Sequence, residues 1–124
     1  MQIEINDKRK VFAIKEEFRK LFPYLKLEFF SKPHKLGGTP AKKFINSDRK
    51  TLGECRTIHD HGKITITPHM TASGLEERFG DIYGLGVRVF VKFENTEVET
   101  TGMDNWALEK LNKHGESLSK DGNQ

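Results

Sequence analysis

The amino-acid sequence predicts an α+β domain with a ferredoxin-like (split β-α-β) sandwich at its core and an extra strand and helix at its C-terminus. Its segments follow one another as strand, helix, strand, loop, strand, helix and strand, which is the order of that sandwich. The expected strands alternate apolar and polar residues, as in an antiparallel sheet with one solvated face. Two segments with apolar residues three and four apart predict the helices that cover the other face.

The composition fits a single folded domain. The chain has 124 residues, of which 35% are hydrophobic and nine are Phe, and its periodic segments argue against global disorder. We expect one domain over residues 1–115, with a long basic loop at about 33–50, because this stretch holds two prolines and a Gly-Gly pair. Residues 116–124 lack an apolar pattern, so we expect a flexible tail there.

The first half of the domain is expected to form two strands around a helix. Residues 2–6 (Q-I-E-I-N) alternate polar and apolar residues and predict the first strand. Asn6 or Asp7 can cap the helix, which ends before Pro23. Its apolar face is formed by residues three and four apart: Val11, Ile14, Phe18 and Leu21. Residues 24–32 (Y-L-K-L-E-F-F-S-K) alternate again and predict the second strand.

The second half is expected to begin with two short strands and a helix. Residues 52–58 and 63–67 predict the strands, with a turn at Asp60-His61-Gly62 between them. Thr71 or Ser73 can cap the helix that follows, and Gly84 is a residue type that commonly ends one.

The chain then continues with its strongest strand pattern. Residues 86–93 (G-V-R-V-F-V-K-F) alternate throughout, and a tight turn at 94–96 leads into E-V-E-T-T, so we expect a hairpin. Asp104 is expected to cap a last helix whose apolar residues include Trp106, Leu108 and Leu111.

Cysteine use and hydropathy favour a cytoplasmic protein. Cys55 is the only cysteine, which excludes a disulfide within the chain. The N-terminal residues lack the apolar segment of a secretory signal, and no apolar run approaches membrane-spanning length. We therefore expect a reducing cytosol, no membrane partner and no cofactor.

Positive charge is concentrated in the first half of the chain. Residues 1–50 hold 13 Lys or Arg against six Asp or Glu, and residues 32–50 hold six Lys or Arg against one acid. Such a segment attracts phosphates or an acidic partner. Charge alone does not distinguish this interpretation from a solvated loop that keeps the protein in solution. Lys42 and Lys43 are the candidate contact residues within the loop.

The stretch C-R-T-I-H-D-H (residues 55–61) is the densest in potential chemistry. Zinc needs three or four ligands in tetrahedral array. His59 and His61 are therefore weak candidates, with His69 as a conceivable third ligand. No C-x-x-C and no H-E-x-x-H is present. Cys55 and His59 are about 13 Å apart on an extended chain, too far for a nucleophile–base pair. We interpret the stretch as a polar turn, with no catalytic residue and no metal site.

One face of the expected sheet interleaves aromatic rings with cations. Its residues point away from the two helices: Lys26, Phe30, Lys63, Arg88, Phe90 and Lys92. RNA-binding sheets stack bases on such rings, and F-V-K-F at 90–93 shares part of the RNP1 pattern. The alternatives are that the last helix covers this face, or that the face forms a protein interface such as a homodimer seam.

Several stretches resemble a group of small uncharacterised bacterial proteins. They are T-L-G-E-C-R, I-T-I-T-P with L-E-E-R-F-G, G-L-G-V-R-V-F-V-K, and E-T-T-G-M-D-N-W-A-L-E-K-L-N. The resemblance covers about residues 51–115 and implies a bacterial cytosolic protein without implying an activity. Val91 stands where the group has a basic residue, and Met103 stands where it has Thr.

These observations favour a non-enzymatic protein-interaction module. The candidate contact residues are Phe30, Lys42, Lys43, Arg88, Phe90 and Lys92. The first alternative is a nucleic-acid-binding domain that uses the basic and aromatic sheet face. The second alternative is a small metal- or thiol-dependent enzyme built around Cys55, His59 and His61.

Overall fold

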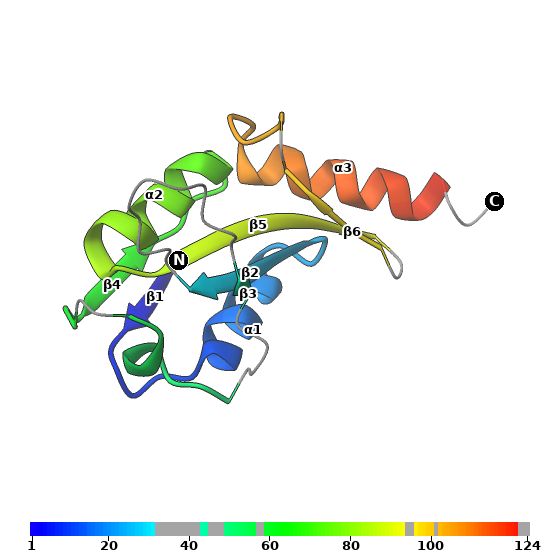
Figure 1. Ribbon diagram of the computed structural model, residues 1–124. Coiled ribbons are helices and arrows are strands. Elements are labelled where there is room, and N and C mark those ends of the chain that lie inside the picture. The colour runs from blue at the N-terminus through cyan, green and yellow to red at the C-terminus, as the bar shows by residue number, and fades with distance from the viewer. Residues whose placement is uncertain (32–42, 45–48, 57–58, 94–95, 101, 122–124) are drawn as a thin grey trace, which may run out of the picture.

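The computed structural model of the protein describes residues 1–31, 43–44, 49–56, 59–93, 96–100 and 102–121 (Figure 1). The strands are β1 (Gln2–Ile5), β2 (Leu25–Ser31), β3 (Lys43–Phe44), β4 (Gly62–Thr65), β5 (Gly86–Phe93) and β6 (Thr96–Glu99). The helices are α1 (Val11–Leu21), α2 (Ala72–Tyr83), α3 (Leu108–Asp121) and the short 3-10 helix η1 (Leu52–Cys55). This mixture of helices and antiparallel strands confirms the α+β class.

The strands form two antiparallel sheets. β1 pairs with β4 in a two-stranded sheet, and the other sheet has the order β3-β2-β5-β6. A ferredoxin-like sandwich has one sheet, so this arrangement differs from the predicted one. Alternation of apolar and polar residues was read correctly for β1, β2, β4 and β5, but alternation does not identify the partner strand.

A single hydrophobic core joins the two sheets and the helices. On the larger sheet, the core side is formed by alternate residues that are all at most 3% exposed: Leu25, Leu27, Phe29, Val87, Val89 and Val91. The ring of Phe79 in α2 meets Phe29 edge-on, with ring centroids 6.2 Å apart. Ile3 and Ile64 bring the smaller sheet into the same core. In the view of Figure 1, α2 and α3 lie above β5, whereas α1 lies below β2.

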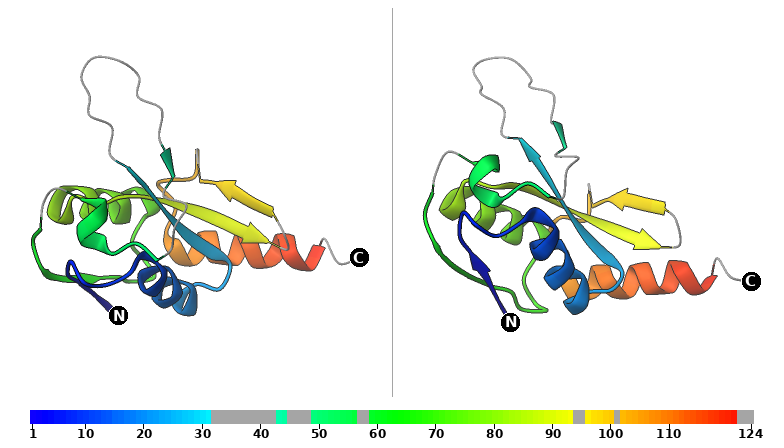
Figure 2. Two further views of the ribbon diagram at one scale, coloured as in Figure 1. Left: turned by 60° about the horizontal axis from the view of Figure 1, so that its bottom comes forward. Right: turned by 90° about the horizontal axis from the view of Figure 1, so that it is seen from below.

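Helix α3 packs on the core side of the sheet. It runs along β5 (Figure 2), and its Leu108 and Leu111 are fully buried. A Cβ atom added at Gly115 would lie 2.8 Å from Tyr24 Cβ and 3.0 Å from Val91 Cγ1. Since Val91 belongs to the core side, α3 does not cover Phe30 and Phe90, which lie on the opposite side of the strands.

The free edge of β5 is closed by side chains rather than by another strand. β6 pairs with β5 only as far as Phe90. Beyond that point, the Val89 N–H donates to Glu76 Oε2 of α2 at 2.9 Å, and Thr100 Oγ1 donates to the Val89 carbonyl at 3.1 Å. These two bonds satisfy backbone groups that would otherwise offer a pairing edge.

The predicted helix boundaries were correct at α2 and at the end of α1, which stops before Pro23, and wrong at the start of α1 and at α3. Thr71 caps α2 by accepting from the Gly74 N–H, and Gly84 ends it at φ 64°. Helix α1 begins at Val11 after an extended Lys10, because Asn6 instead accepts from the Lys8 and Arg9 N–H groups in a local turn.

Helix α3 begins and ends later than predicted. It begins at Leu108, not after Asp104, since the Asp104 carbonyl accepts from the Ser73 N–H and the Trp106 carbonyl from the Ala72 N–H. It continues to Asp121, so residues 116–121 are helical, and the prediction of a flexible tail from residue 116 was wrong for them. Leu111 and Gly115, one turn apart, both lie against the core and hold this helix in place.

Two further predictions in the middle of the chain need correction. Residues 52–55 form η1 rather than a strand, because Thr51 and Glu54 make a capping box: each side chain bonds the other residue's backbone N–H. Within the predicted loop at 33–50, residues 43–44 form β3 and pair with Phe30 and Ser31 of β2. Residues 33–42 and 45–48, including Lys42, lie outside the described residues, as do the side chains of β3.

Candidate functional site

The predicted aromatic and basic residues of β2 and β5 come together on one side of the larger sheet. We call this side the open face and define it by its half-buried residues: Lys26, Glu28, Phe30, Arg88, Phe90 and Lys92. The strand register sets Lys26 opposite Phe90 and Glu28 opposite Arg88. Phe30, Arg88, Phe90 and Lys92 therefore share the surface that the sequence predicted.

Lys63 does not belong to the open face, contrary to the prediction. It lies on β4 in the smaller sheet, directly opposite Glu4 of β1. The prediction failed because it placed all strands in one sheet. Lys43 lies on β3, beside the open face, but the structure describes only its backbone.

The charges on the open face are of both signs and are largely paired. Lys26 Nζ lies 2.8 Å from Glu97 Oε2 and 3.2 Å from Glu28 Oε2, and Lys15 of α1 lies 2.8 Å from Glu28. Burial lowers the pKa of Lys26, but the bonds to Glu97 and Glu28 outweigh burial and raise the pKa above 10.5. Lysines whose positive charge is balanced by a neighbouring carboxylate attract a polyanion only weakly.

A small basic pocket adjoins the open face where α1 meets the sheet. The pocket has a volume of about 140 Å³ and is lined by Phe12, Lys15, Glu16, Arg19, Lys26 and Lys92. Phe12 is 54% exposed. Among the described residues, Lys92 has no ion-pair partner. The pocket thus combines an exposed ring with four cations and one carboxylate.

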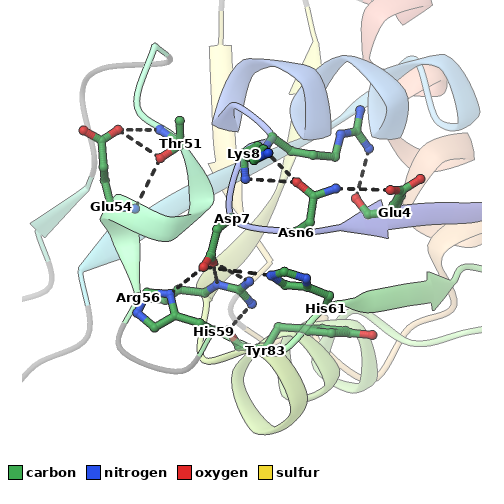
Figure 3. A network of polar contacts seen from close by, with 11 residues as sticks. Glu4, Asn6, Asp7, Lys8, Thr51, Glu54, Arg56, His59, His61 and Tyr83 are labelled. Carbon is green, nitrogen blue, oxygen red and sulfur yellow. Dashed lines mark hydrogen bonds and ion pairs between the residues drawn. The ribbon is translucent and has the colours of Figure 1, made fainter.

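A second cluster, which the sequence did not predict, is centred on Asp7 (Figure 3). The Arg56 side chain is completely buried, and its Nε and Nη2 atoms donate to Asp7 Oδ1 at 3.0 and 2.7 Å. Its Nη1 atom donates to the Tyr83 carbonyl at 3.1 Å, and the Tyr83 hydroxyl donates to the Lys63 carbonyl. Arg56 thereby ties together the turn after β1, the end of η1 and the end of α2.

His59 and His61 also converge on Asp7. His59 Nδ1 lies 2.8 Å from Asp7 Oδ2, and His61 Nε2 lies 4.0 Å from the same oxygen. Figure 3 shows their rings on either side of the carboxylate. The hydrogen bond from Arg56 is the main reason why the pKa of Asp7 lies below its ordinary value of 3.8. At neutral pH an ionised Asp7 only accepts hydrogen bonds, so His59 Nδ1 must carry the proton.

The described side chains around Asp7 do not form a metal-ligand group. His69, the conceivable third ligand, pairs instead with Glu109 of α3 at 3.3 Å. In the part of the chain that the structure describes, no three His, Cys, Asp or Glu side chains form a group that could hold a metal ion. The bidentate guanidinium already occupies one oxygen of Asp7, the carboxylate on which His59 and His61 converge.

Cys55 lies in η1 and packs against the hydrophobic core. Burial raises the pKa of its thiol, the carboxylate of Glu54 acts in the same direction, and the opposing effect of Lys50 does not compensate. A nucleophilic cysteine needs the opposite shift, since the thiolate is the reactive species. The arrangement therefore gives no support to a thiol enzyme.

We expect Cys55 to react slowly with the disulfide reagent DTNB in the folded protein. At pH 8 the reaction should be about tenfold slower than in urea-unfolded protein, because burial disfavours the thiolate. Stopped-flow absorbance, recorded once without urea and once in urea that unfolds the protein, measures this ratio of rates. Free cysteine serves as the reference. Equal rates in the folded and unfolded protein would contradict the half-buried position of the thiol.

A wide polar groove lies beside the Asp7 cluster. It has a volume of about 1080 Å³ and runs over the outer side of the β1–β4 sheet and the turn that follows β1. Its lining residues are Gln2, Glu4, Asn6, Asp7, Lys8, Arg9, Glu17, His61 and Lys63. The groove was not predictable from the sequence, because it depends on the pairing of β1 with β4.

Comparison of the chain with protein-family models, with curated proteins and with solved structures gave no match. Among the described residues, no helix has the length and apolar character needed to cross a membrane. The function must therefore be argued from the open face, the basic pocket and the polar groove themselves.

Proposed function

We propose that the protein is a cytoplasmic, non-enzymatic interaction module that binds an acidic segment of a partner protein through the open face and the basic pocket. As the resemblance of residues 51–115 implies, we take it to be bacterial. The observation that carries the proposal is the basic pocket, where the exposed ring of Phe12 lies near Lys92, which has no ion-pair partner among the described residues. The other three cations of the pocket are paired with carboxylates: Lys15 with Glu28, Lys26 with Glu28 and Glu97, and Arg19 with Glu16. An apolar side chain flanked by Asp or Glu would complement both the ring and the charges.

The open face extends this contact surface. Phe30 and Phe90 supply aromatic area of the kind that is enriched in interfaces, while Arg88 and Lys92 add positive charge beside it. Lys92 belongs to both surfaces, since it lines the basic pocket and follows Phe90 on β5 by two residues. The basic residues 32–50, with Lys42 and Lys43, would add attraction for the same acidic partner.

The charge pattern favours a protein partner over a nucleic acid. Glu28 and Glu97 hold the Lys26 ammonium between them, so a phosphate backbone that follows the open face would meet both carboxylates. The acidic side chains of a peptide can instead contact Lys92, which has no ion-pair partner among the described residues. Nucleic-acid surfaces instead keep their lysines and arginines available to phosphates. Alternating charges around aromatic rings suit a polypeptide, which can offer acids, bases and apolar groups together.

The test is a fluorescence-anisotropy titration with a short labelled peptide of glutamates around a central Phe-Leu pair. We expect saturable binding that Lys92→Glu weakens by about tenfold, and that Phe90→Ala also weakens. Lys113→Glu on the exposed side of α3 makes the same charge change elsewhere and is expected to have little effect.

Three outcomes would contradict the proposal. The first is no binding of the peptide at low salt, and the second is equal loss of affinity in Lys92→Glu and Lys113→Glu. The third is tighter binding of single-stranded RNA than of the peptide with a steep salt dependence, which would favour the nucleic-acid alternative. Sedimentation of the free protein as a dimer that Phe90→Ala dissociates would instead identify a second copy as the occupant.

A further inference from the structure

The polar groove has an unusual lining. All nine of its lining residues are polar or charged, whereas ligand pockets are ordinarily lined by apolar and aromatic side chains with a few polar groups. The polar ends of these side chains suit a ligand with many polar groups, while their aliphatic stems also form part of the groove's surface. The absence of an aromatic ring among these nine residues also disfavours a ligand with a planar base, which would need a stacking partner.

Three charged residues of the groove have no ion-pair partner within the described residues: Lys8, Lys63 and Glu4, which lies directly opposite Lys63. Arg9 forms an ion pair with Glu17, and Asp7 is held by the buried Arg56, which is not itself a lining residue. By contrast, neither Lys8 nor Lys63 has an ion-pair partner within the described residues. The groove therefore offers two available ammonium groups to an anion.

His61 adds a third group for an anion at the same place. Its ring lines the groove and is 62% exposed on the side chain, and its Nε2 atom lies 4.0 Å from Asp7 Oδ2. Lys63 is separated from His61 only by Gly62, where β4 begins. An imidazole and an ammonium group from neighbouring positions are common partners for the oxygens of a phosphate.

Neutral and acidic groups occupy the floor of the groove. Gln2 and Glu4 project from the outer side of β1, since Ile3 and Ile5 face the core. Asn6 Nδ2 donates to Glu4 Oε2 at 3.1 Å, which fixes the orientation of both side chains. Amides and carboxylates arranged in this way accept hydrogen bonds from several hydroxyl groups at once.

We propose that the polar groove is a binding site for a small, hydroxyl-rich phosphate ester of the sugar-phosphate class. Lys8, Lys63 and His61 hold the phosphate, while Gln2 and Glu4 accept from the hydroxyls of the sugar. The buried Arg56 and its partner Asp7 support the turn that carries Lys8. This site is separate from the open face and does not depend on the protein partner proposed above.

The test follows the imidazole signals of the full chain by NMR while glucose 6-phosphate is added at constant ionic strength. We expect the His61 signals to shift and saturate with a Kd below ~10 mM, a range in which weak specific binding is measurable. The signals of His69, which is paired with Glu109 on another part of the surface, should stay in place and serve as the internal reference. Inorganic phosphate should bind more weakly, and glucose alone should cause no shift.

Substitution of single lysines tests where on the protein the sugar phosphate binds. Lys63→Gln should raise the Kd by about tenfold, whereas Lys113→Gln on α3 should leave it unchanged. The proposal is overturned by three results: no saturable shift of His61, an equal response to inorganic phosphate and to the sugar phosphate, or unchanged affinity in Lys63→Gln. Tighter binding of adenosine monophosphate than of glucose 6-phosphate would likewise contradict the sugar-phosphate class.

Discussion

The Asp7→Asn variant is expected to unfold at a much lower urea concentration than the wild-type protein. This substitution keeps the shape of the side chain and removes its charge. The Arg56 guanidinium is completely buried and would then have no anion beside it. Leaving a buried guanidinium unpaired costs roughly 3 kcal/mol or more. Urea unfolding followed by circular dichroism at pH 7 measures the loss.

Arg56→Met is the matched partner of this variant and should be clearly less harmful. It removes the buried charge and replaces it with an apolar side chain of similar length, while Asp7, one-third exposed, remains solvated. We expect less than half of the loss caused by Asp7→Asn. If Arg56→Met proves the more destabilising of the two, the guanidinium is not the group that requires compensation.

The ion pair between Asp7 and Arg56 also makes the stability of the protein depend on pH. The pKa of Asp7 is depressed in the folded protein below its ordinary value of 3.8. A depressed pKa contributes stability that is fully present above the unfolded pKa and is lost as the pH falls through the folded pKa. The wild-type protein should therefore lose stability between about pH 5 and pH 2 more steeply than Asp7→Asn does.

Gly115→Ala is expected to destabilise the protein, against the usual preference of helices. In an open helix position, Gly→Ala stabilises by about 1 kcal/mol. At Gly115 the new Cβ would lie 2.8 Å from Tyr24 Cβ and 3.1 Å from the Tyr24 backbone oxygen. Because backbone cannot yield like a flexible side chain, α3 must move away from β5, and overpacking of this kind costs roughly 1 to 3 kcal/mol.

Gly80 provides the control for this prediction within the same chain. It lies in α2, and the nearest atom to an added Cβ is the Leu85 carbonyl oxygen at 3.9 Å, an ordinary contact distance. Gly80→Ala should therefore raise the midpoint of thermal unfolding, whereas Gly115→Ala should lower it. A rise for both variants would mean that α3 does not pack against Tyr24 and Val91 as described.

The local sequence pattern was sufficient to predict much of this fold. The alternation in β5 separated buried Val89 from half-buried Phe90, and Gly84 marked the end of α2 through its left-handed backbone. Both are short-range effects, decided by neighbours within a few residues. The grouping of Phe30 with Arg88, Phe90 and Lys92 followed from the same alternation.

Long-range partners were not predictable in this way. Nothing near Arg56 in the sequence indicates that its partner is Asp7, 49 positions earlier. Likewise, the alternation of residues along β4 correctly placed Lys63 on the exposed side of its strand. The sheet to which that strand belongs, however, depends on its pairing with β1. The polar groove and the Asp7 cluster both result from such pairings. One local signal was available and overlooked: Thr51-x-x-Glu54 is a capping box, which indicates a helical start and not a strand.

The pairing of β1 with β4 has a consequence for the synthesis of the protein on the ribosome. The described residues give β1 no other strand as a partner, and the amino group of Met1 itself donates to the carbonyl of Ile66. β1 must therefore wait until β4 has been synthesised before it can pair. β2 must wait about as long for β5, although it can pair earlier with β3. Nascent chains that expose unpaired strands are prone to association, so β1 is exposed to such association until β4 has been made.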